Sequence, residues 1–283
     1  MDTNLIKKLR EQTNRGVLEC KKALALNHND YDKALAYLNE TYEAPKTNDR
    51  VASKGLCHVV IKDDEAILFE VNAETDFVAK NEDFLKLVND LGERLIDSDV
   101  SNAKSALKLD IFETNIESHI KKVSATIQEK VNLRRFYRVL KASNQTFGTY
   151  FHGGGRVVTL VILNQQNEKL ARDLALQIAA TSPIYLDLSY IDIDTMNYEK
   201  FMFEKKHGQF DEKAFHQYLE SITLYTQPFI YEDDKTVEAI LYEHHVQIID
   251  FFRFELGQGI EDKLNCRLDI PCDGSKITVT PIY

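Results

Sequence analysis

Glycine and proline are scarce in this 283-residue sequence, which has only 11 and 5 of them. Such low counts exclude fibrous chains and wholly disordered chains. Long apolar runs are also missing, because stretches such as 157–163 fall well short of the roughly 18 residues that span a bilayer. With 35 Lys and Arg against 45 Asp and Glu, the net charge is −10, so the chain lacks the basic excess of a non-specific nucleic-acid binder.

The four cysteines are scattered along the chain. They lie at positions 20, 57, 266 and 272, and no two of them form a CxxC pair. This spacing fits neither a disulfide framework nor a four-thiolate zinc site, so we expect free thiols. The first eight residues carry charges within their apolar stretch and lack the hydrophobic core of a signal peptide. We therefore expect a cytoplasmic protein with no membrane partner.

The rest of the composition is that of a folded protein of about two domains, with 43% hydrophobic and 28% charged residues. Residues 1–42 predict a three-helix domain whose third helix is capped by a polar side chain from 27–30. Its apolar residues recur at helical spacing in the stretches 5–9, 17–24 and 31–38. The polar residues 43–54 predict a linker, so the three-helix domain is expected to act as a docking module on a tether.

Strand and helix patterns follow one another beyond the linker. Residues 56–61 and 66–71 predict a β-hairpin, and the apolar spacing of 84–95 predicts a helix. The next predicted elements are a helix over 111–133, strands over 135–141, 146–151 and 156–163, and a helix over 170–180. This order predicts an α+β fold with two related core subdomains. The first subdomain covers 55–141, and the second covers 142–184 with 226–263.

The second subdomain is interrupted by a predicted helical hairpin over 185–225, which turns at 207–209. After the hairpin, 235–243 predicts a helix and 245–256 predicts a strand. The C-terminal tail, 264–283, shows no readable pattern.

No motif for covalent catalysis or for binding nucleotide phosphates is present. Neither GxxxxGK[ST] nor GxGxxG occurs in the chain. The HGGG run at 152–155 matches the oxyanion loop of some esterases, but the GxSxG motif that such esterases need is missing. His244 and His245 are not accompanied by HExxH or by other His and Cys residues. We therefore expect no enzyme activity, no cofactor and no metal site.

Residues 71–84 run from the end of a predicted strand into the start of a predicted helix, where scaffolds present functional side chains. A purely structural interpretation is open as well. In that interpretation Asp76 caps the helix and Phe77 fills the core.

Within this stretch, residues 74–84 (ETDFVAKNEDF) resemble the signature of the bacterial elongation factor Ts family. Residues 1–42 are similar to that family's ubiquitin-associated-like domain. The resemblance extends in collinear order over about residues 4–262. Its other segments are 50–52, 55–56, Glu129, 133–135, 150–156, 178–180, 227–229 and 252–261.

The resemblance implies a guanine nucleotide exchange factor for elongation factor Tu, the GTPase that delivers aminoacyl-tRNA to the ribosome. The magnesium ion and the GDP or GTP would belong to that partner, so this chain itself would need no cofactor. By resemblance, Asp76 and Phe77, flanked by Thr75 and Val78, would intrude on the partner's magnesium and nucleotide site. A binding or holding partner of elongation factor Tu that lacks exchange activity is the alternative.

Further partner contacts are implied by the resemblance in three places. They are Arg10, Val17 and Leu18 in the three-helix domain, His152 beside its glycines, and Ile230 with Tyr231. Structural interpretations are open here too: Val17 and Leu18 could be core, His152 a strand-end histidine, and Ile230 and Tyr231 ordinary edge residues.

The chain departs from the family pattern at several positions. Val17 and Leu18 stand where the family more often has Met, Asn14 and Arg15 replace small residues, and 213–218 lacks the usual Gly-Arg pair. The first of these changes puts the detail of the N-terminal contact in doubt. Self-association through the 185–225 hairpin and proximity to tRNA are left open, and no role is assigned to the tail.

Overall fold

The computed structural model describes residues 3–13, 16–40 and 52–260. Most of the predicted linker and the whole predicted tail lie outside these residues. The described residues form an α+β fold, as predicted, and divide into two compact units. One unit holds the described residues up to 139 together with 154–156 and 254–260, and the other holds 140–153 and 157–253. Among the helices of the described ranges, none is long and apolar enough to cross a membrane.

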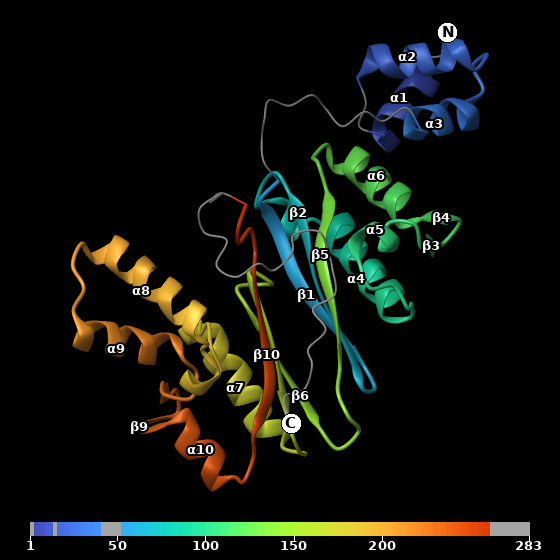
Figure 1. The fold of residues 1–283 in the computed structure, drawn as a ribbon. Helices are drawn as coiled ribbons and strands as arrows, with labels where there is room; N and C mark the ends of the chain where they lie inside the picture. The colour runs from blue at the N-terminus through green and yellow to red at the C-terminus, as the bar shows by residue number, and fades with distance from the viewer. Residues whose placement is uncertain (1–2, 14–15, 41–51, 261–283) are drawn as a thin grey trace. The chain divides into compact units, whose positions relative to one another are not determined.

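The N-terminal part consists of three helices, α1 (Thr3–Thr13), α2 (Val17–Leu26) and α3 (Tyr31–Glu40) (Figure 1). Asp30 caps α3, because its carboxylate accepts a hydrogen bond from the Lys33 N–H at 3.1 Å. The hydrophobic core of the three helices consists of Leu9, Cys20, Ala23, Leu24, Ala34 and Leu38. The three predicted helices and the predicted cap are confirmed.

The first unit also contains a three-stranded sheet of order β1-β2-β5, formed by β1 (Lys54–Lys62), β2 (Glu65–Ala73) and β5 (Asn132–Leu140). Strands β1 and β2 form the predicted hairpin, with Lys54 opposite Ala73 and Lys62 opposite Glu65. At the turn between them, Asp63 adopts a left-handed conformation with φ 53°. Aspartate tolerates such a conformation better than most residues, which suits it to this turn.

Helices cover one face of this sheet (Figure 1). They are η1 (Val78–Lys80), α4 (Glu82–Ile96), α5 (Ala103–Ala106) and α6 (Ile116–Ile127), and the short strands β3 (Asp110–Ile111) and β4 (Thr114–Asn115) precede α6. The apolar face of α4, which includes Phe84, Leu87, Leu91 and Leu95, is buried against β-strand residues such as Phe69. This packing explains the helical spacing of these residues in the sequence.

The second unit contains a sheet of order β10-β7-β6, formed by β6 (Thr146–His152), β7 (Val157–Leu163) and β10 (Ile248–Glu255). Helix α7 (Glu168–Thr181) packs closely on β6 and β7. Gly148 in β6 allows this approach, because a Cβ atom at this position would lie 2.2 Å from the Ala171 carbonyl oxygen of α7.

Between α7 and β10 lies the predicted pair of helices, α8 (Ile193–His207) and α9 (Glu212–Ile222). Helix α8 ends at Gly208, which has a φ of 77°, and this position accounts for the break predicted at 207–209. The remaining elements are η2 (Leu188–Tyr190), β8 (Pro228–Phe229), β9 (Glu232–Thr236) and α10 (Val237–Glu243).

The prediction of one helix over 111–133 is wrong at both ends. Ile111 lies in β3, and α6 begins only after Asn115, whose side chain accepts a hydrogen bond from the Ser118 N–H at 2.9 Å. The helix ends at Gln128, which has a φ of 58°, and Leu133 lies in β5. Ile111 and Leu133 are buried in the same core as α6, so their spacing imitates a continuous helical stripe.

Two later boundaries were also predicted wrongly. Lys235 and Thr236 belong to β9, and the Thr236 hydroxyl caps α10 by accepting a hydrogen bond from the Ala239 N–H at 3.2 Å. Strand β10 begins at Ile248, because His245 adopts a left-handed conformation with φ 55° that an extended strand excludes.

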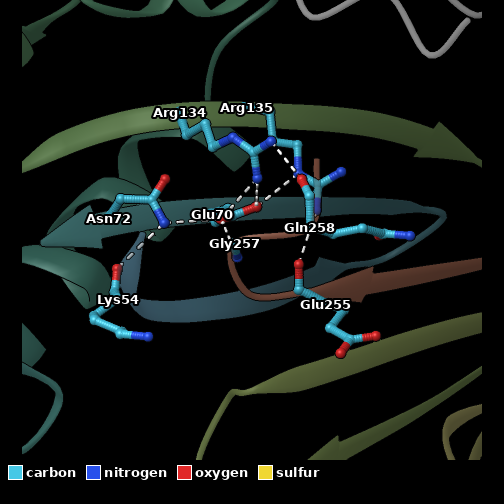
Figure 2. Close-up of polar contacts among 8 residues, drawn as sticks. All are labelled: Lys54, Glu70, Asn72, Arg134, Arg135, Glu255, Gly257 and Gln258. Carbon is cyan, nitrogen blue, oxygen red and sulfur yellow. Dashed lines mark hydrogen bonds and ion pairs between the residues drawn. The ribbon is translucent and has the colours of Figure 1, made fainter. Parts of the chain in front are cut away.

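A fully buried carboxylate, that of Glu70 in β2, organises the first unit (Figure 2). Arg134 donates from Nη1 to both of its oxygens at 3.0 and 2.9 Å, and Arg135 donates from Nε at 2.7 Å. The Asn72 amide and the Gly257 N–H also donate to it, at 2.8 and 2.9 Å. The buried charge is therefore compensated by two cations and further hydrogen bonds, as burial of a charge requires.

The two arginines extend this network to the end of β10 and to the residues that follow it. Arg134 donates from Nη2 to the Gln258 carbonyl at 2.5 Å, and Arg135 donates to the Glu255 carbonyl at 3.1 Å. Asn72 reaches in another direction and donates to the Lys54 carbonyl at 3.2 Å. Figure 2 shows how side chains of β2 and β5 meet backbone groups of β1 and of the 255–258 segment in this network.

The pKa of Glu70 shows that its partners outweigh the effect of burial on the carboxyl. Burial by itself raises the pKa of the Glu70 carboxyl, but Arg135, the Gly257 N–H, Asn72 and Arg134 outweigh burial and hold this pKa below its ordinary value of 4.5. Its contribution to stability is therefore present above pH 4.5 and is lost as the pH falls through the lowered pKa of the folded state.

Glu70→Gln is expected to lower the free energy of unfolding at pH 7 by about 3 kcal/mol, because it leaves two partly buried arginines without their carboxylate. Urea unfolding of the variant and the wild type measures this loss, which should shrink as the pH falls below 4.5. Glu93→Gln, at an exposed position of α4, is the control. An equal loss of stability in both variants would contradict the role given to Glu70.

The contribution of Asp250, in β10, to stability is expected to have the opposite pH dependence. Burial raises the pKa of its carboxyl from the ordinary 3.8 to about 6. A hydrogen bond from the Phe251 N–H lowers this pKa, but by less than burial raises it. The favourable contribution of the neutral carboxyl is complete below pH 3.8 and is lost as the pH rises through about 6. Asp250→Asn should therefore stabilise the protein at pH 7.5 by about 2 kcal/mol and leave its stability near pH 4 almost unchanged. Thermal unfolding at the two pH values tests this.

Candidate partner-binding site

The turn after β2 presents one aromatic side chain to solvent. Residues 74–77 form bends and a turn between β2 and η1. The Phe77 side chain is 82% exposed, whereas the next residue, Val78, is only 4% exposed and belongs to the core of the first unit. Asp76 is exposed beside Phe77, and Thr75 is half-buried. The turn thus combines an exposed carboxylate and an exposed ring with an adjacent buried anchor.

The structural interpretation of Asp76 and Phe77 is wrong. Asn81, not Asp76, caps α4, since its side-chain oxygen accepts hydrogen bonds from the Asp83 and Phe84 N–H groups at 2.9 and 3.1 Å. Phe77 does not fill the core, and Phe84 and Val78 do so instead. Neither Asp76 nor Phe77 is therefore explained by the packing of the fold.

The turn is fixed from a distant part of the sequence. The Glu129 carboxylate accepts hydrogen bonds from the Thr75 N–H at 2.9 Å and from the Thr75 hydroxyl at 2.5 Å. Nothing in the local pattern of the sequence indicates this contact. Glu129 was identified only as a family-like position, with no role.

The candidate residues of the three-helix domain lie on its surface. Leu18 is 80% exposed, Val17 is about half exposed, and Arg10 is exposed. The interpretation of Val17 and Leu18 as core is therefore wrong, because Cys20, Ala23 and Leu24 occupy the buried face of α2. Asn14 and Arg15 lie outside the described residues.

His152 lies exposed at the end of β6, opposite Val157 of β7. The residues that follow it, Gly153 and Gly154, have φ values of 57° and 68°, and a Cβ atom at Gly154 would meet nothing within 4 Å. The backbone conformation therefore favours glycine at both positions, and at Gly154 crowding within the chain plays no part. The open space leaves the backbone beside His152 accessible.

Ile230 and Tyr231 lie on the turn between β8 and β9. Tyr231 is 59% exposed, and Ile230 is also exposed. Their backbone is held by the buried Gln177 of α7, whose side-chain oxygen accepts a hydrogen bond from the Ile230 N–H at 2.8 Å. Gln177 donates in turn to the Pro228 carbonyl at 3.1 Å. Sequence reasoning missed this supporting residue, which directly precedes the family-like segment 178–180.

These exposed groups suit binding to a partner. In the part of the chain that the structure describes, no group of three or more His, Cys, Asp and Glu side chains is arranged to hold a metal ion. Cys20 and Cys57 are buried, and burial raises the pKa of the Cys57 thiol well above its ordinary value. A buried thiol with a raised pKa is a poor nucleophile.

Comparison with known proteins assigns the family. A family model described as Elongation factor TS matches residues 74–258. The Elongation factor Ts of Acholeplasma laidlawii (strain PG-8A) is 37% identical to this chain, in an alignment that covers 92% of this chain and 94% of that protein. The chain belongs to the elongation factor Ts family. The residues matched by the family model begin at the exposed turn after β2. They end at Gln258, whose carbonyl accepts a hydrogen bond from Arg134 in the Glu70 network.

The division between Phe77 and Val78 can be tested by stability alone. Phe77→Ala is expected to change the free energy of unfolding by less than about 0.5 kcal/mol, because the exposed ring contributes little to the core. Val78→Ala should lower it by about 2 kcal/mol, because it leaves a cavity in the first unit. Chemical unfolding of the two variants measures the difference. A larger loss for Phe77→Ala would mean that the ring packs inward.

Proposed function

We propose that this chain is the guanine nucleotide exchange factor of elongation factor Tu. It binds elongation factor Tu, disturbs the magnesium and GDP site of that protein, and promotes GDP release so that GTP can bind during translation elongation. Membership of the elongation factor Ts family supports this function. The observation that carries it is the Phe77 ring, which is exposed on a turn whose neighbouring residues are fixed.

The chemistry of the turn suits a wedge, by which we mean the exposed Phe77 ring and Asp76 carboxylate inserting into the partner. An exposed aromatic ring gains free energy when a partner covers it, and such anchors often dominate protein interfaces. The Asp76 carboxylate beside it carries a charge that can disturb the ligands of a nearby magnesium ion. Magnesium neutralises the phosphate oxygens of a bound nucleotide, so a disturbed magnesium site weakens the nucleotide's hold. The ion and the nucleotide belong to the partner, and no covalent step is required of this chain.

Thermodynamic linkage sets how much binding energy the proposed exchange requires. A factor that lowers the affinity of the partner for GDP must itself be bound less tightly when GDP is present, and to the same degree. A 10⁴-fold change requires about 5.5 kcal/mol of differential binding, more than one surface contact supplies. We therefore propose that Arg10, Val17 and Leu18, then His152, and then Ile230 with Tyr231 provide further contacts.

The setting of this activity is part of the proposal. A translation factor of this kind acts in the cytoplasm. Self-association through the hairpin and proximity to tRNA stay predictions. The exposed apolar side chains of Ile193 and Phe201 on α8 are compatible with the former.

The second candidate function, holding elongation factor Tu without exchange, is less well supported. Loss of exchange would be expected to remove the side chains that intrude on the nucleotide site. Asp76 and Phe77 are both retained, and both are exposed.

Release of a fluorescent GDP from elongation factor Tu, at fixed magnesium concentration and with catalytic amounts of this chain, tests the function. The wild-type chain should accelerate release, and Phe77→Ala and Asp76→Ala should each reduce the acceleration about tenfold, as loss of an interface anchor does.

Phe112→Ala is the matched control, because Phe112 is 72% exposed in the same unit and belongs to none of the proposed contacts. It should leave the acceleration unchanged. Binding to elongation factor Tu without any acceleration of GDP release by the wild-type chain would overturn the exchange function and favour the holding function.

A further inference from the structure

The 74–77 turn is braced by two carboxylates in opposite directions. Glu129 accepts from both donors of Thr75, one oxygen for the N–H at 2.9 Å and the other for the hydroxyl at 2.5 Å. Glu74 accepts from the Lys130 N–H at 3.3 Å. Each segment thus supplies a carboxylate to the backbone of the other. Hydrogen bonds to a charged acceptor are the stronger kind, so the fork at Thr75 is the main part of this brace.

The segment that carries Glu129 is itself fixed. Gln128 takes the left-handed conformation that ends α6, and its side chain donates to the Ala125 carbonyl at 2.7 Å. Two residues after Glu129, the Val131 N–H donates to the buried Ser124 hydroxyl at 3.0 Å. Glu129 therefore reaches Thr75 from a backbone that is anchored on both sides.

The brace continues the pairing of β2 with β5. These strands are neighbours in the sheet, and Glu70 of β2 contacts Arg134 of β5. Five residues after Glu70, Thr75 contacts Glu129, which lies five residues before Arg134. The two hydrogen bonds between Thr75 and Glu129, the Thr75 fork, thus continue the antiparallel contacts of β2 with β5 beyond the last residue of β2.

We propose that Glu129 is a positioning residue for nucleotide exchange, which acts through Thr75 to hold Asp76 and Phe77 in their outward orientation. The inference rests on the exchange function proposed above. Residues 74–77 have the end of β2 on one side and the buried Val78 on the other, and Glu129 fixes the backbone between these two anchors. A preorganised wedge loses less conformational freedom when it inserts, so more of its contact energy is available to displace the nucleotide.

Glu129→Gln tests this role at nearly constant size. The amide nitrogen of glutamine cannot accept a hydrogen bond, so one of the two Thr75 donors loses its partner. In the GDP release assay we expect kcat for exchange to fall about tenfold, with KM for elongation factor Tu changed less than about twofold. Tenfold corresponds to about 1.4 kcal/mol, close to the lower end of what hydrogen bonds to charged groups contribute.

Two control variants separate positioning from general support of the fold. Glu113→Gln removes an exposed carboxylate near α6 and should leave kcat unchanged. Asn115→Ala removes the cap at the opposite end of the same helix, which should cost about 1 kcal/mol of stability without an effect on kcat. A loss of kcat in Asn115→Ala as large as in Glu129→Gln would overturn the positioning role.

Hydrogen exchange of the Thr75 amide gives a readout that does not depend on the partner. In Glu129→Gln this amide should exchange faster, whereas the amides of β2 should keep the wild-type rates. Faster exchange throughout the first unit would indicate partial unfolding and would count against the inference.

Failure of the inference can be told apart from failure of the exchange function. If the wild-type chain accelerates GDP release and Phe77→Ala slows it, but Glu129→Gln retains the wild-type kcat, only the positioning role is overturned. If the wild-type chain gives no acceleration, the exchange function falls first. A double-mutant cycle with Thr75→Val should show losses that do not add, because both changes break the same fork.

Discussion

The buried Glu70 carboxylate is the constraint on which the first unit depends. A charge in the interior must be matched closely by partners, and here the partners come from β2, β5 and the segment after β10. Each donor therefore fixes the position of its own backbone element relative to β2. In the observed arrangement of these elements, the donors offset the cost of burying Glu70.

That arrangement determines where the candidate wedge lies. Once Glu70 and Arg134 align β2 with β5, the end of β2 is brought opposite the start of β5, and Thr75 meets Glu129. The turn between β2 and η1 then has little freedom, since Val78 is anchored in the core. A largely exposed phenylalanine on such a turn is unfavourable for the isolated protein. It is consistent with a side chain whose apolar surface is buried only in a complex.

Exchange of this kind requires no covalent chemistry from the factor, but it requires that the contact residues be held in position. In the exchange function proposed above, the phosphates and the magnesium are those of elongation factor Tu, and the factor acts by binding one state of that protein better than another. Carboxylates and amides that fix backbone, such as Glu129 at Thr75 and Gln177 at Ile230, matter in this scheme as much as the exposed side chains.

The sequence by itself determined the α+β class, the three N-terminal helices, the β1–β2 hairpin and the family signature around Phe77, because each depends on local periodicity or on a contiguous motif. It misplaced the ends of the predicted helix 111–133, since burial in a common core gives Ile111 and Leu133 the spacing of a helix. Only the tertiary structure decided that Phe77 faces outward and that Glu129 holds Thr75. Contacts between residues more than fifty positions apart, and the direction of an apolar side chain in a turn, leave no periodic pattern in a single sequence.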